Sequence, residues 1–458
     1  MSQSAAPRRG SHVVVIGASM GGLVAAAAVA PYFDRVTVLE RDVLPTEPAP
    51  RRGVPQGRHA HGFQPGGLIA LDSVLPGVTG KLAAGGAPSG DTGLQSSWYV
   101  GGVNFARGES GIVTMGFTRP YVEHTVRSEV SALANVTLRD RTEVLGVLAT
   151  GTVVGGVRAV SEGAEPEDLV ADLVIDGSGR ASRLPEWLEE LGLPRPAEEQ
   201  VHCKMAYLSR RWMLPEGAAA GDVLRVCTPD ETPRFGVCIA QEDGSHIMTI
   251  GGLLNSGPEN DEDAYRSFAA ALPSGDFGTL LDGAVPVTDL ASSHFPYSRR
   301  RRYDALREHP VGLIALGDSI ASFNPMYGQG MSVAAREAVA LRDLLEKGIP
   351  DARHYYKAMH RIEDVAWKIS TGGDLRFDAV EGKRTPDMKV MNAYLDALAR
   401  AAQVDPELNH QFSRVAGFID PPQAFFRPST LLRVWRGNRK ARRQAAAAQQ
   451  ASELVTAG

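Results

Sequence analysis

The segment that most constrains the fold is a run of apolar residues that leads into a glycine-rich turn. Val13–Ile16 are all β-branched, which is typical of a strand buried on both faces of a parallel sheet. Residues 17–22 read Gly-Ala-Ser-Met-Gly-Gly, and the alanine-rich stretch 23–30 then suits a helix packed closely on that sheet. We therefore expect a strand, a tight turn and a helix, the opening of an α/β fold.

The residue types in this turn predict a nucleotide site. Gly17 would make the turn, and Gly22 would let helix and strand approach each other. Ser19 replaces the middle glycine of the dinucleotide fingerprint but is small enough for a pyrophosphate to approach the amides at the helix N-terminus. A second strand, 36–39, ends at Glu40, whose carboxylate can accept hydrogen bonds from an adenosine ribose and disfavours a 2′-phosphate. The alternative is a βαβ unit without a ligand.

Composition narrows the class of protein. The chain has 458 residues, enough for two or three domains, and a net charge of -5, which argues against nucleic-acid binding. Cys203, Cys227 and Cys238 are scattered, so we expect buried free thiols and no metal site. Residues 1–10 lead into no apolar signal-peptide run and no segment is long enough to span a membrane, so we expect a cytoplasmic protein. The basic cluster 299–302 is interpreted as an ion-paired or solvated face.

Two further acids follow predicted buried strands. The strand 169–175 runs into Asp176-Gly177, and the strand 311–316 runs into Gly317-Asp318. Ligands bind at the carboxyl ends of such strands in open α/β sheets. A loop rich in Pro and Gly, 319–332, then opens a helix to Glu346, which places backbone amides and a positive helix end beside the second acid.

The rest of the chain predicts a second sheet and a helical end. Residues 201–296 contain short alternating runs that indicate antiparallel strands, and the chain beyond Asp351 is helical in pattern. The tail 436–458 begins basic and predicts an exposed helix. Five apolar residues near it are able to touch a membrane surface, but we favour packing on the body of the protein: Phe425, Phe426, Leu431, Leu432 and Trp435.

A long loop follows the nucleotide-type unit. It carries Arg58, His59 and His61, which either line a cofactor or belong to a solvated surface loop. A metal site at the two histidines is not favoured, because no third ligand lies nearby. The aromatic side chain of Trp98 faces either a substrate cavity or a packed core.

With these three elements in order, the chain resembles the FAD-dependent monooxygenases of the para-hydroxybenzoate hydroxylase fold. The matching motifs are Gly17/Ser19/Gly22 with Glu40, Asp176-Gly177, and Gly317-Asp318 with Pro325, Gly328 and Gly330. Within that group, residues 53–61 and 323–332 are similar to bacterial epoxidases of polyether antibiotic biosynthesis and related natural-product tailoring enzymes. The similarity covers roughly 13–340.

The resemblance implies an α/β architecture. We expect a Rossmann-like FAD-binding domain of the GR2 type with a three-layer ββα arrangement, an inserted antiparallel β-sheet substrate domain and C-terminal helices. The expected FAD-binding domain is discontinuous and comprises 11–80, 112–192 and 297–350. The expected substrate domain comprises 81–111 and 193–296, and 351–458 forms the helical region.

The resemblance also implies roles for residues. Asp318 would bond the ribityl chain, the Gly330 and Met331 amides would face the flavin pyrimidine edge, and Glu40 would hold the ribose. The full cofactor set is Gly17, Ser19, Met20, Gly22, Glu40, Arg41, Arg58, Arg119, Asp176, Gly177, Asp318, Pro325, Gly328, Gly330 and Met331. Polar neighbours of the reaction would be Arg58, His59, His61 and Tyr327. Substrate contacts would come from Trp98, Phe117, Tyr207, Phe235 and Tyr327.

The implied activity is monooxygenation of a hydrophobic secondary metabolite, most simply alkene epoxidation. Reduced flavin would capture O₂ as a C4a-hydroperoxide and pass one oxygen atom to the substrate. NADPH or NADH would supply electrons directly or through a flavin reductase, and we expect no nucleic-acid partner, no metal and no stable membrane insertion. The alternatives are an aromatic hydroxylase, an FAD-dependent double-bond reductase and a non-catalytic FAD-containing binding protein. A halogenase is disfavoured, because no Trp-x-Trp-x-Ile-Pro segment is present.

Overall fold

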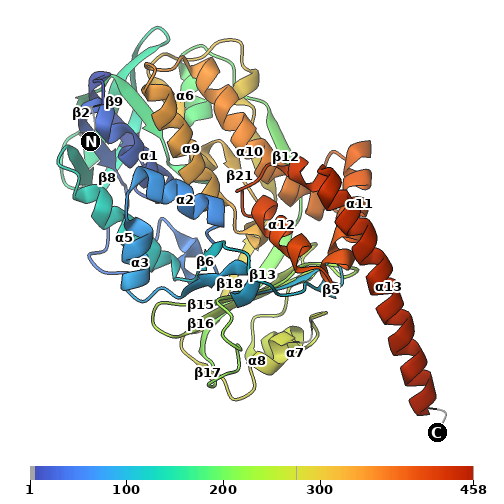
Figure 1. The fold of residues 1–458 in the computed structure, drawn as a ribbon. Coiled ribbons are helices and arrows are strands. Elements are labelled where there is room, and N and C mark those ends of the chain that lie inside the picture. The colour runs from blue at the N-terminus through green and yellow to red at the C-terminus, as the bar shows by residue number, and fades with distance from the viewer. Residues whose placement is uncertain (1–5, 275, 457–458) are drawn as a thin grey trace, which may run out of the picture. The chain divides into compact units, whose positions relative to one another are not determined.

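Figure 1 shows the computed structural model, which describes residues 6–274 and 276–456. The chain forms two compact units, each assembled from three stretches of sequence. Unit 1 comprises the chain up to Gly85, Thr118–Val201 and Tyr297–Ser370. Unit 2 comprises Gly86–Phe117, His202–Pro296 and the chain from Thr371 onward.

Unit 1 is built on a five-stranded parallel sheet in the order β20-β11-β1-β2-β7. Its central strand contains Val13, Val14 and Val15, all fully buried, as the run of β-branched residues predicts. In sheet order, the strands are Leu313–Ala315, Leu173–Asp176, Gly10–Ile16, Phe33–Leu39 and Val136–Arg139.

Helices and a second sheet layer cover this sheet. The helices α1 (Met20–Val29) and α2 (Pro65–Val74) both pack on α9 (Gly330–Leu345) (Figure 1). An antiparallel sheet β10-β9-β8 contacts β2 and β11, and its strands are Glu167–Val170, Val153–Ser161 and Thr142–Thr150. A small sheet contains β12 (Glu198–Val201), β19 (Ser298–Arg301) and β21 (Ala321–Ser322), and the other helices are α3 (Val78–Ala84), α5 (Arg119–Ser131) and α6 (Leu184–Glu190).

The prediction of one continuous strand over 169–175 is wrong, because the chain passes from one sheet to another within this range. β10 ends at Val170 and β11 begins at Leu173. At the break, the Asp172 carboxylate accepts hydrogen bonds from the backbone amides of Ser11 and His12. This polar anchor on the start of β1 redirects the chain from the antiparallel layer into the parallel sheet.

Unit 2 contains an antiparallel-rich sheet of eight strands. Along the path β17-β13-β16-β15-β14-β4-β5 its strands are Val285–Pro286, Met205–Met213, His246–Gly252, Arg234–Ala240, Leu224–Cys227, Ser96–Val100 and Val103–Asn104, with β18 (Ala291–Phe295) paired to β13. A two-stranded ladder joins β3 (Ser89–Asp91) to β6 (Val113–Met115). The helices of the unit are α4 (Thr92–Gln95), α7 (Glu262–Ala270), α8 (Asp276–Leu280), α11 (Pro386–Ala402), α12 (Pro406–Ala416) and α13 (Pro428–Thr456).

The predicted α/β fold, with a parallel sheet, an inserted antiparallel sheet and C-terminal helices, is confirmed, but the helical region is not a separate part. α10 (Ala352–Asp374) belongs to unit 1 as far as Ser370, and it is anchored there to β20, because the hydroxyl of Tyr355 donates to the Ala315 carbonyl. In unit 2, Leu398 of α11, Leu408 of α12 and Phe105 beside β5 share one buried core. The predicted helical region 351–458 is therefore divided between the units, and its residues 457–458 lie outside the described residues.

Two other expectations concern side chains. Within unit 1, Arg300 pairs with Glu199 at 2.6 Å and Arg301 pairs with Glu198 at 3.2 Å, so the basic cluster is an ion-paired face. The three cysteines are buried free thiols. Over the described residues, no single helix is long and apolar enough to cross a membrane, although α2 and α3, bent by 112°, pass that test as a pair.

Candidate functional site

The glycine turn of unit 1 brings three backbone segments into direct contact. Gly17 has φ +95°, a conformation that L side chains rarely adopt. A Cβ on Gly22 would lie 1.8 Å from the Gly17 carbonyl oxygen, and a Cβ on Gly177 would lie 3.0 Å from the Gly22 Cα. Only glycine fits this approach of β1, β11 and α1. Ser19 caps α1 without a side-chain capping bond, so the first amides of the helix keep their donors for a ligand.

Ser19 has a role that the sequence pattern does not show. Its hydroxyl accepts from Arg119 Nη2 at 2.8 Å and lies 3.3 Å from the carboxylate of Glu123. Arg119 and Glu123 are one helical turn apart on α5 and form an ion pair at 3.1 Å. Thr118 caps that helix, because its hydroxyl accepts from the Tyr121 amide. The serine in place of a glycine therefore ties the turn to α5.

A chain of charged groups extends from this turn to the end of β2. The Glu40 carboxylate accepts from the Ala18 amide at 2.9 Å and the Asp42 amide at 3.0 Å, and Arg51 lies 3.2 Å from it. Arg51 also pairs with Glu123 at 2.8 Å. Burial opposes ionisation of Glu123, but Arg119 and Arg51 outweigh it and hold the pKa of Glu123 below its ordinary value.

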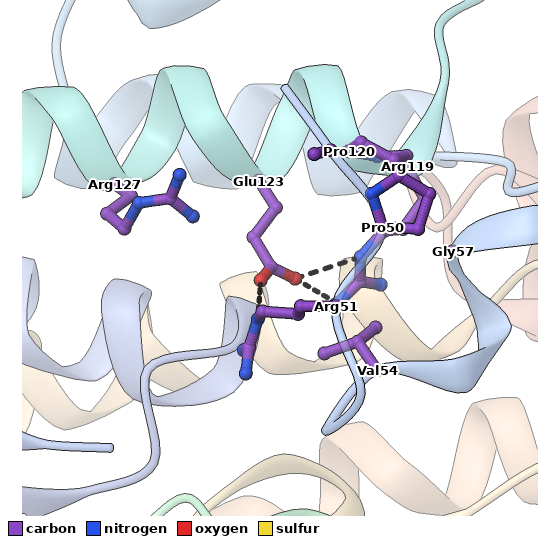
Figure 2. Close-up of a pocket in the computed structure, with 9 residues that line it drawn as sticks. Pro50, Arg51, Val54, Gly57, Arg119, Pro120, Glu123 and Arg127 are labelled. Atoms are coloured by element: carbon purple, nitrogen blue, oxygen red, sulfur yellow. Dashed lines mark hydrogen bonds and ion pairs between the residues drawn. The ribbon is translucent and has the colours of Figure 1, made fainter. Parts of the chain in front are cut away.

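Figure 2 shows the pocket beside this network, with Arg51, Arg119 and Arg127 around Glu123. Arg51 Nη2 is buried and has no hydrogen-bond partner among the described residues. An unpaired buried guanidinium nitrogen is costly, so this atom is a donor suited to an anionic or polar ligand. The remaining lining comes from Ala49, Pro50, Val54, Gly57 and Pro120.

Asp318 is the second acid that faces this end of the sheet. Its carboxylate has no hydrogen bond within the described part of the chain, and burial raises its pKa although Arg180, Arg119 and Arg299 oppose the rise. The helices α1 and α9 both begin near it. A Cβ on Gly317 would lie 3.9 Å from the Gly21 Cα in the first turn of α1, and a Cβ on Gly330 would lie 3.5 Å from Asp318 Oδ1.

α9 starts without a side-chain cap on Gln329, which leaves its first amides available. Two positive helix ends and an unpartnered carboxylate thus meet at one place in unit 1. A hydrogen bond to α9 fixes the residue before Asp318, because the Gly317 amide donates to the Glu337 carboxyl group at 2.7 Å. Burial raises the pKa of both Glu337 and the neighbouring Glu363, so this pair of carboxyl groups retains a proton.

The loop with the two histidines lies against the start of α9. The side chain of Gln64 donates through Nε2 to the Tyr327 carbonyl at 2.9 Å, and the backbone amide of Gln64 donates to Ser332 Oγ at 2.8 Å. His61 Nδ1 lies 2.9 Å from the His59 carbonyl oxygen. Burial lowers the pKa of His59 to about 4 and that of His61 to about 3. Both rings are therefore neutral near pH 7.

Other predicted cofactor residues take different positions. Asp176 is fully buried and accepts from the hydroxyls of Ser178 and Ser182, so it organises its own turn. Met20 is buried on α1. The exposed residues of the predicted set are Arg41, Arg58 and Pro325. Gly328, in the same loop before α9 as Pro325, adopts φ +60°.

The predicted substrate residues belong to both units. Tyr327 lies in unit 1, whereas Phe117, Tyr207 and Phe235 are buried in unit 2. Trp98, also in unit 2, packs edge-on against Phe412 at a centroid distance of 6.0 Å. The packed-core interpretation thus fits Trp98, and the substrate role of the set stays a prediction.

Sequence reasoning missed Arg51, Glu123 and Glu337. The spacing of Arg119 and Glu123, four residues apart after a Thr cap, is the one pattern that signals a helical ion pair. Arg51 lies in a loop rich in Pro and Arg, where no spacing distinguishes it from Arg52 or Arg58.

Comparison with known proteins agrees with this geometry. The family model described as FAD binding domain matches residues 11–354. Protein Rv3254 of Mycobacterium tuberculosis is 32% identical over 466 residues, which cover 94% of this chain and 96% of that protein. Kynurenine 3-monooxygenase of Salinispora arenicola is 26% identical, and the alignment covers 95% of this chain and 100% of that protein. Plant squalene epoxidases and monooxygenases match at 22–25% identity.

Among solved structures, the flavin-dependent brominase Bmp2 has a TM-score of 0.65 at 13% identity and covers 89% of this chain and 94% of its own. This likeness concerns the fold alone. The family match spans the β1–α1 turn, the Asp176 turn and the Asp318 loop. The first and the last of these leave amides or a carboxylate for a ligand, whereas Asp176 is satisfied by its own turn. The chain belongs to the FAD binding domain family and is an FAD-dependent monooxygenase related to kynurenine and squalene monooxygenases.

Proposed function

We propose that FAD binds along the carboxyl edge of the parallel sheet in unit 1 and serves the epoxidation of a hydrophobic secondary metabolite. One observation supports this binding mode above all others. The N-termini of α1 and α9, both without a side-chain cap, meet at Asp318, and Asp318 has no protein hydrogen-bond partner among the described residues.

The residues present fit FAD in three ways. The α1 turn has room for no side chain at Gly17 and Gly22, and its free amides suit a pyrophosphate. Glu40 has three hydrogen-bond or ion-pair contacts to the protein, and a carboxylate offers about four acceptor sites, so capacity remains for a ribose hydroxyl. The unpaired Arg51 Nη2 adds a donor at the same end of the site.

When bound and reduced, FAD supplies the O₂ chemistry, and the protein supplies position and electrostatics. In this proposal Asp318 accepts from a ribityl hydroxyl, and the Gly330 and Met331 amides orient the flavin edge at the positive end of α9. Arg119, held by Ser19 and Glu123, faces the diphosphate.

The neutral histidines restrict what the loop contributes. Because the pKa of His59 is about 4 and that of His61 about 3, neither ring is a cationic acid at neutral pH. We propose that they act with Tyr327 and Arg58 as polar neighbours that orient flavin or substrate. This suits oxygen transfer to an alkene, because the substrate itself has no proton to lose.

The choice of alkene epoxidation rests on the similarity of residues 53–61 and 323–332 to polyether-type epoxidases, and relatives called squalene epoxidase support it. Aromatic hydroxylation is the competing outcome, since other relatives are called kynurenine 3-monooxygenase. We propose NADPH or NADH as the electron source, used directly or through a flavin reductase.

The test offers the FAD-loaded protein polyenes and electron-rich aromatics in matched pairs under ¹⁸O₂ with reduced nicotinamide. The proposal predicts one ¹⁸O atom in an epoxide and nicotinamide oxidation that depends on the alkene. Incorporation of ¹⁸O into a phenol, with the alkenes unchanged, would show that the enzyme hydroxylates aromatic rings and does not epoxidise alkenes. Saturation of the alkene without oxygen uptake would indicate a double-bond reductase and contradict the proposal.

A further inference from the structure

The C-terminal part of unit 2 exposes a group of large apolar side chains. Phe426 is 45% exposed, and in the first turns of α13 Leu431 is 42%, Leu432 46% and Trp435 55% exposed. The expectation that these side chains pack on the body holds for Phe425, which is 6% exposed, and in part for Phe426, whose ring stacks on Tyr394 at a centroid distance of 5.1 Å. It is wrong for Leu431, Leu432 and Trp435.

The exposure follows from how α13 is seated. Thr430, Val434 and Gly437, spaced by three or four residues, are buried, and a Cβ on Gly437 would lie 2.7 Å from Ala401 Cβ of α11. The helical repeat directs Leu432 and Trp435 to the other side. In Figure 1 the last turns of α13 extend beyond α11 and α12.

The same helix concentrates positive charge. From Pro421 to Ser452 the chain has seven basic residues and no acidic residue. Arg433 pairs with Asp405 at 3.1 Å, and Arg427 lies 3.5 Å from Asp420. Arg436, Arg442 and Arg443 make no hydrogen bond or ion pair within the described part of the chain.

One contact joins the apolar and basic groups. The guanidinium of Arg439 lies over the Trp435 ring, 4.8 Å from its centroid. Arg439 and Trp435 therefore share one face of α13. The helical repeat of about 100° per residue places five more residues within about a third of a turn of Trp435: Leu431, Leu432, Arg436, Arg442 and Arg443. We call this face, together with Phe426 just before the helix, the α13 patch. It consists of Phe426, Leu431, Leu432, Trp435, Arg436, Arg439, Arg442 and Arg443.

We propose that the α13 patch docks the protein on the surface of an anionic lipid bilayer. Leucine and tryptophan side chains enter the boundary between headgroups and acyl chains, and the arginines lie among the phosphates. This is contact with one leaflet, and it does not depend on the chemistry proposed for unit 1.

Charge and polarity favour lipid over two other occupants. A nucleic acid would satisfy the arginines but would offer no apolar layer to Leu431 and Leu432. A second copy seated through the same face would bring two uncompensated basic helices together, and like charges repel at such distances. An anionic bilayer complements both parts of the patch.

The test measures sedimentation of the full FAD-loaded protein with vesicles of phosphatidylcholine and with vesicles that also contain phosphatidylglycerol. We expect binding to the anionic vesicles only, weakening as salt is raised, and a blue shift of Trp435 emission that the Trp435→Phe variant lacks. The triple variant R436Q/R442Q/R443Q removes charges that have no partner within the described part of the chain, so we expect its fold to be preserved. It should bind roughly a hundredfold more weakly.

Two further variants complete the design. The control R141Q/R158Q/R195Q removes the same charge from exposed arginines of unit 1 and should bind like the unaltered protein. The variant L432N/W435Q should bind roughly tenfold more weakly. Equal binding to both vesicle types, or an unchanged triple variant, overturns the proposal. Loss of binding in the control as well would assign the binding to net charge and would also overturn the proposal. Binding of a DNA duplex that the L432N/W435Q variant retains would assign the patch to nucleic acid, with the same consequence.

Discussion

Alanine substitutions at Gly21 and Gly22 test the contact between β1 and α1. Both residues are in the first turn of α1, and both gain up to about 1 kcal/mol of helix propensity when replaced by alanine. A Cβ on Gly21 would have its nearest neighbour, Leu316 Cδ2, at 3.7 Å, an ordinary contact. A Cβ on Gly22 would lie 1.8 Å from the Gly17 carbonyl oxygen and 2.9 Å from its carbon, both backbone atoms.

The gain in propensity is common to both variants, so the difference between them isolates the clash. Forcing an extra carbon into a packed site costs about 1–3 kcal/mol, and a clash with backbone falls at the upper end. We expect G21A to be as stable as the unaltered protein or slightly more stable, and G22A to be about 3 kcal/mol less stable than G21A.

Urea unfolding followed by circular dichroism measures this difference, and FAD titration followed by flavin fluorescence measures binding. Relief of the clash moves the α1 amides, so G22A should also bind FAD more than tenfold more weakly, while G21A should keep its affinity. Equal stability and equal FAD affinity in the two variants would refute the contact and its role in cofactor binding.

Three other predictions concern the site. Asp318→Asn should weaken FAD binding roughly tenfold to a hundredfold by loss of a charged acceptor, measured by the same titration, and unchanged affinity would remove Asp318 from the site. Ser19→Gly, which restores the fingerprint, should lower stability by about 1 kcal/mol in urea because Arg119 loses an acceptor; a more stable variant would contradict that role. The raised pKa of Glu337 and Glu363 means that stability falls as pH rises above the ordinary value of 4.5. Glu363→Gln should flatten that fall in urea unfolding at a series of pH values, and an unchanged slope would show that the pair does not share a proton.

The sequence is sufficient for those parts of the site that depend on local pattern. Gly17 and Gly22 occupy the positions their spacing predicts. The helix predicted after the loop 319–332 is present and begins at Gly330, inside the expected loop. The network of Arg51 with Glu123 was not predictable, because these residues are 72 positions apart and nothing local distinguishes one loop arginine from another. The strand break at Asp172 has the same origin, since its partners Ser11 and His12 lie far away in the chain.

The C-terminal helices show a related limit. The helical periodicity of the sequence predicts α11 and α13, but it does not indicate which of the two units each helix packs on. Leu398 packs in unit 2 with Phe105, a residue that precedes it by most of the chain. Tyr355 binds β20 of unit 1 through a single hydroxyl.

The most direct test of the account is the visible spectrum of the purified protein during anaerobic addition of NADPH or NADH, with and without a flavin reductase, followed by O₂. We expect one tightly bound FAD per chain that bleaches on reduction and regains its colour as O₂ is consumed. A colourless protein that takes up no FAD on titration, or bound FAD that neither route reduces, would contradict it.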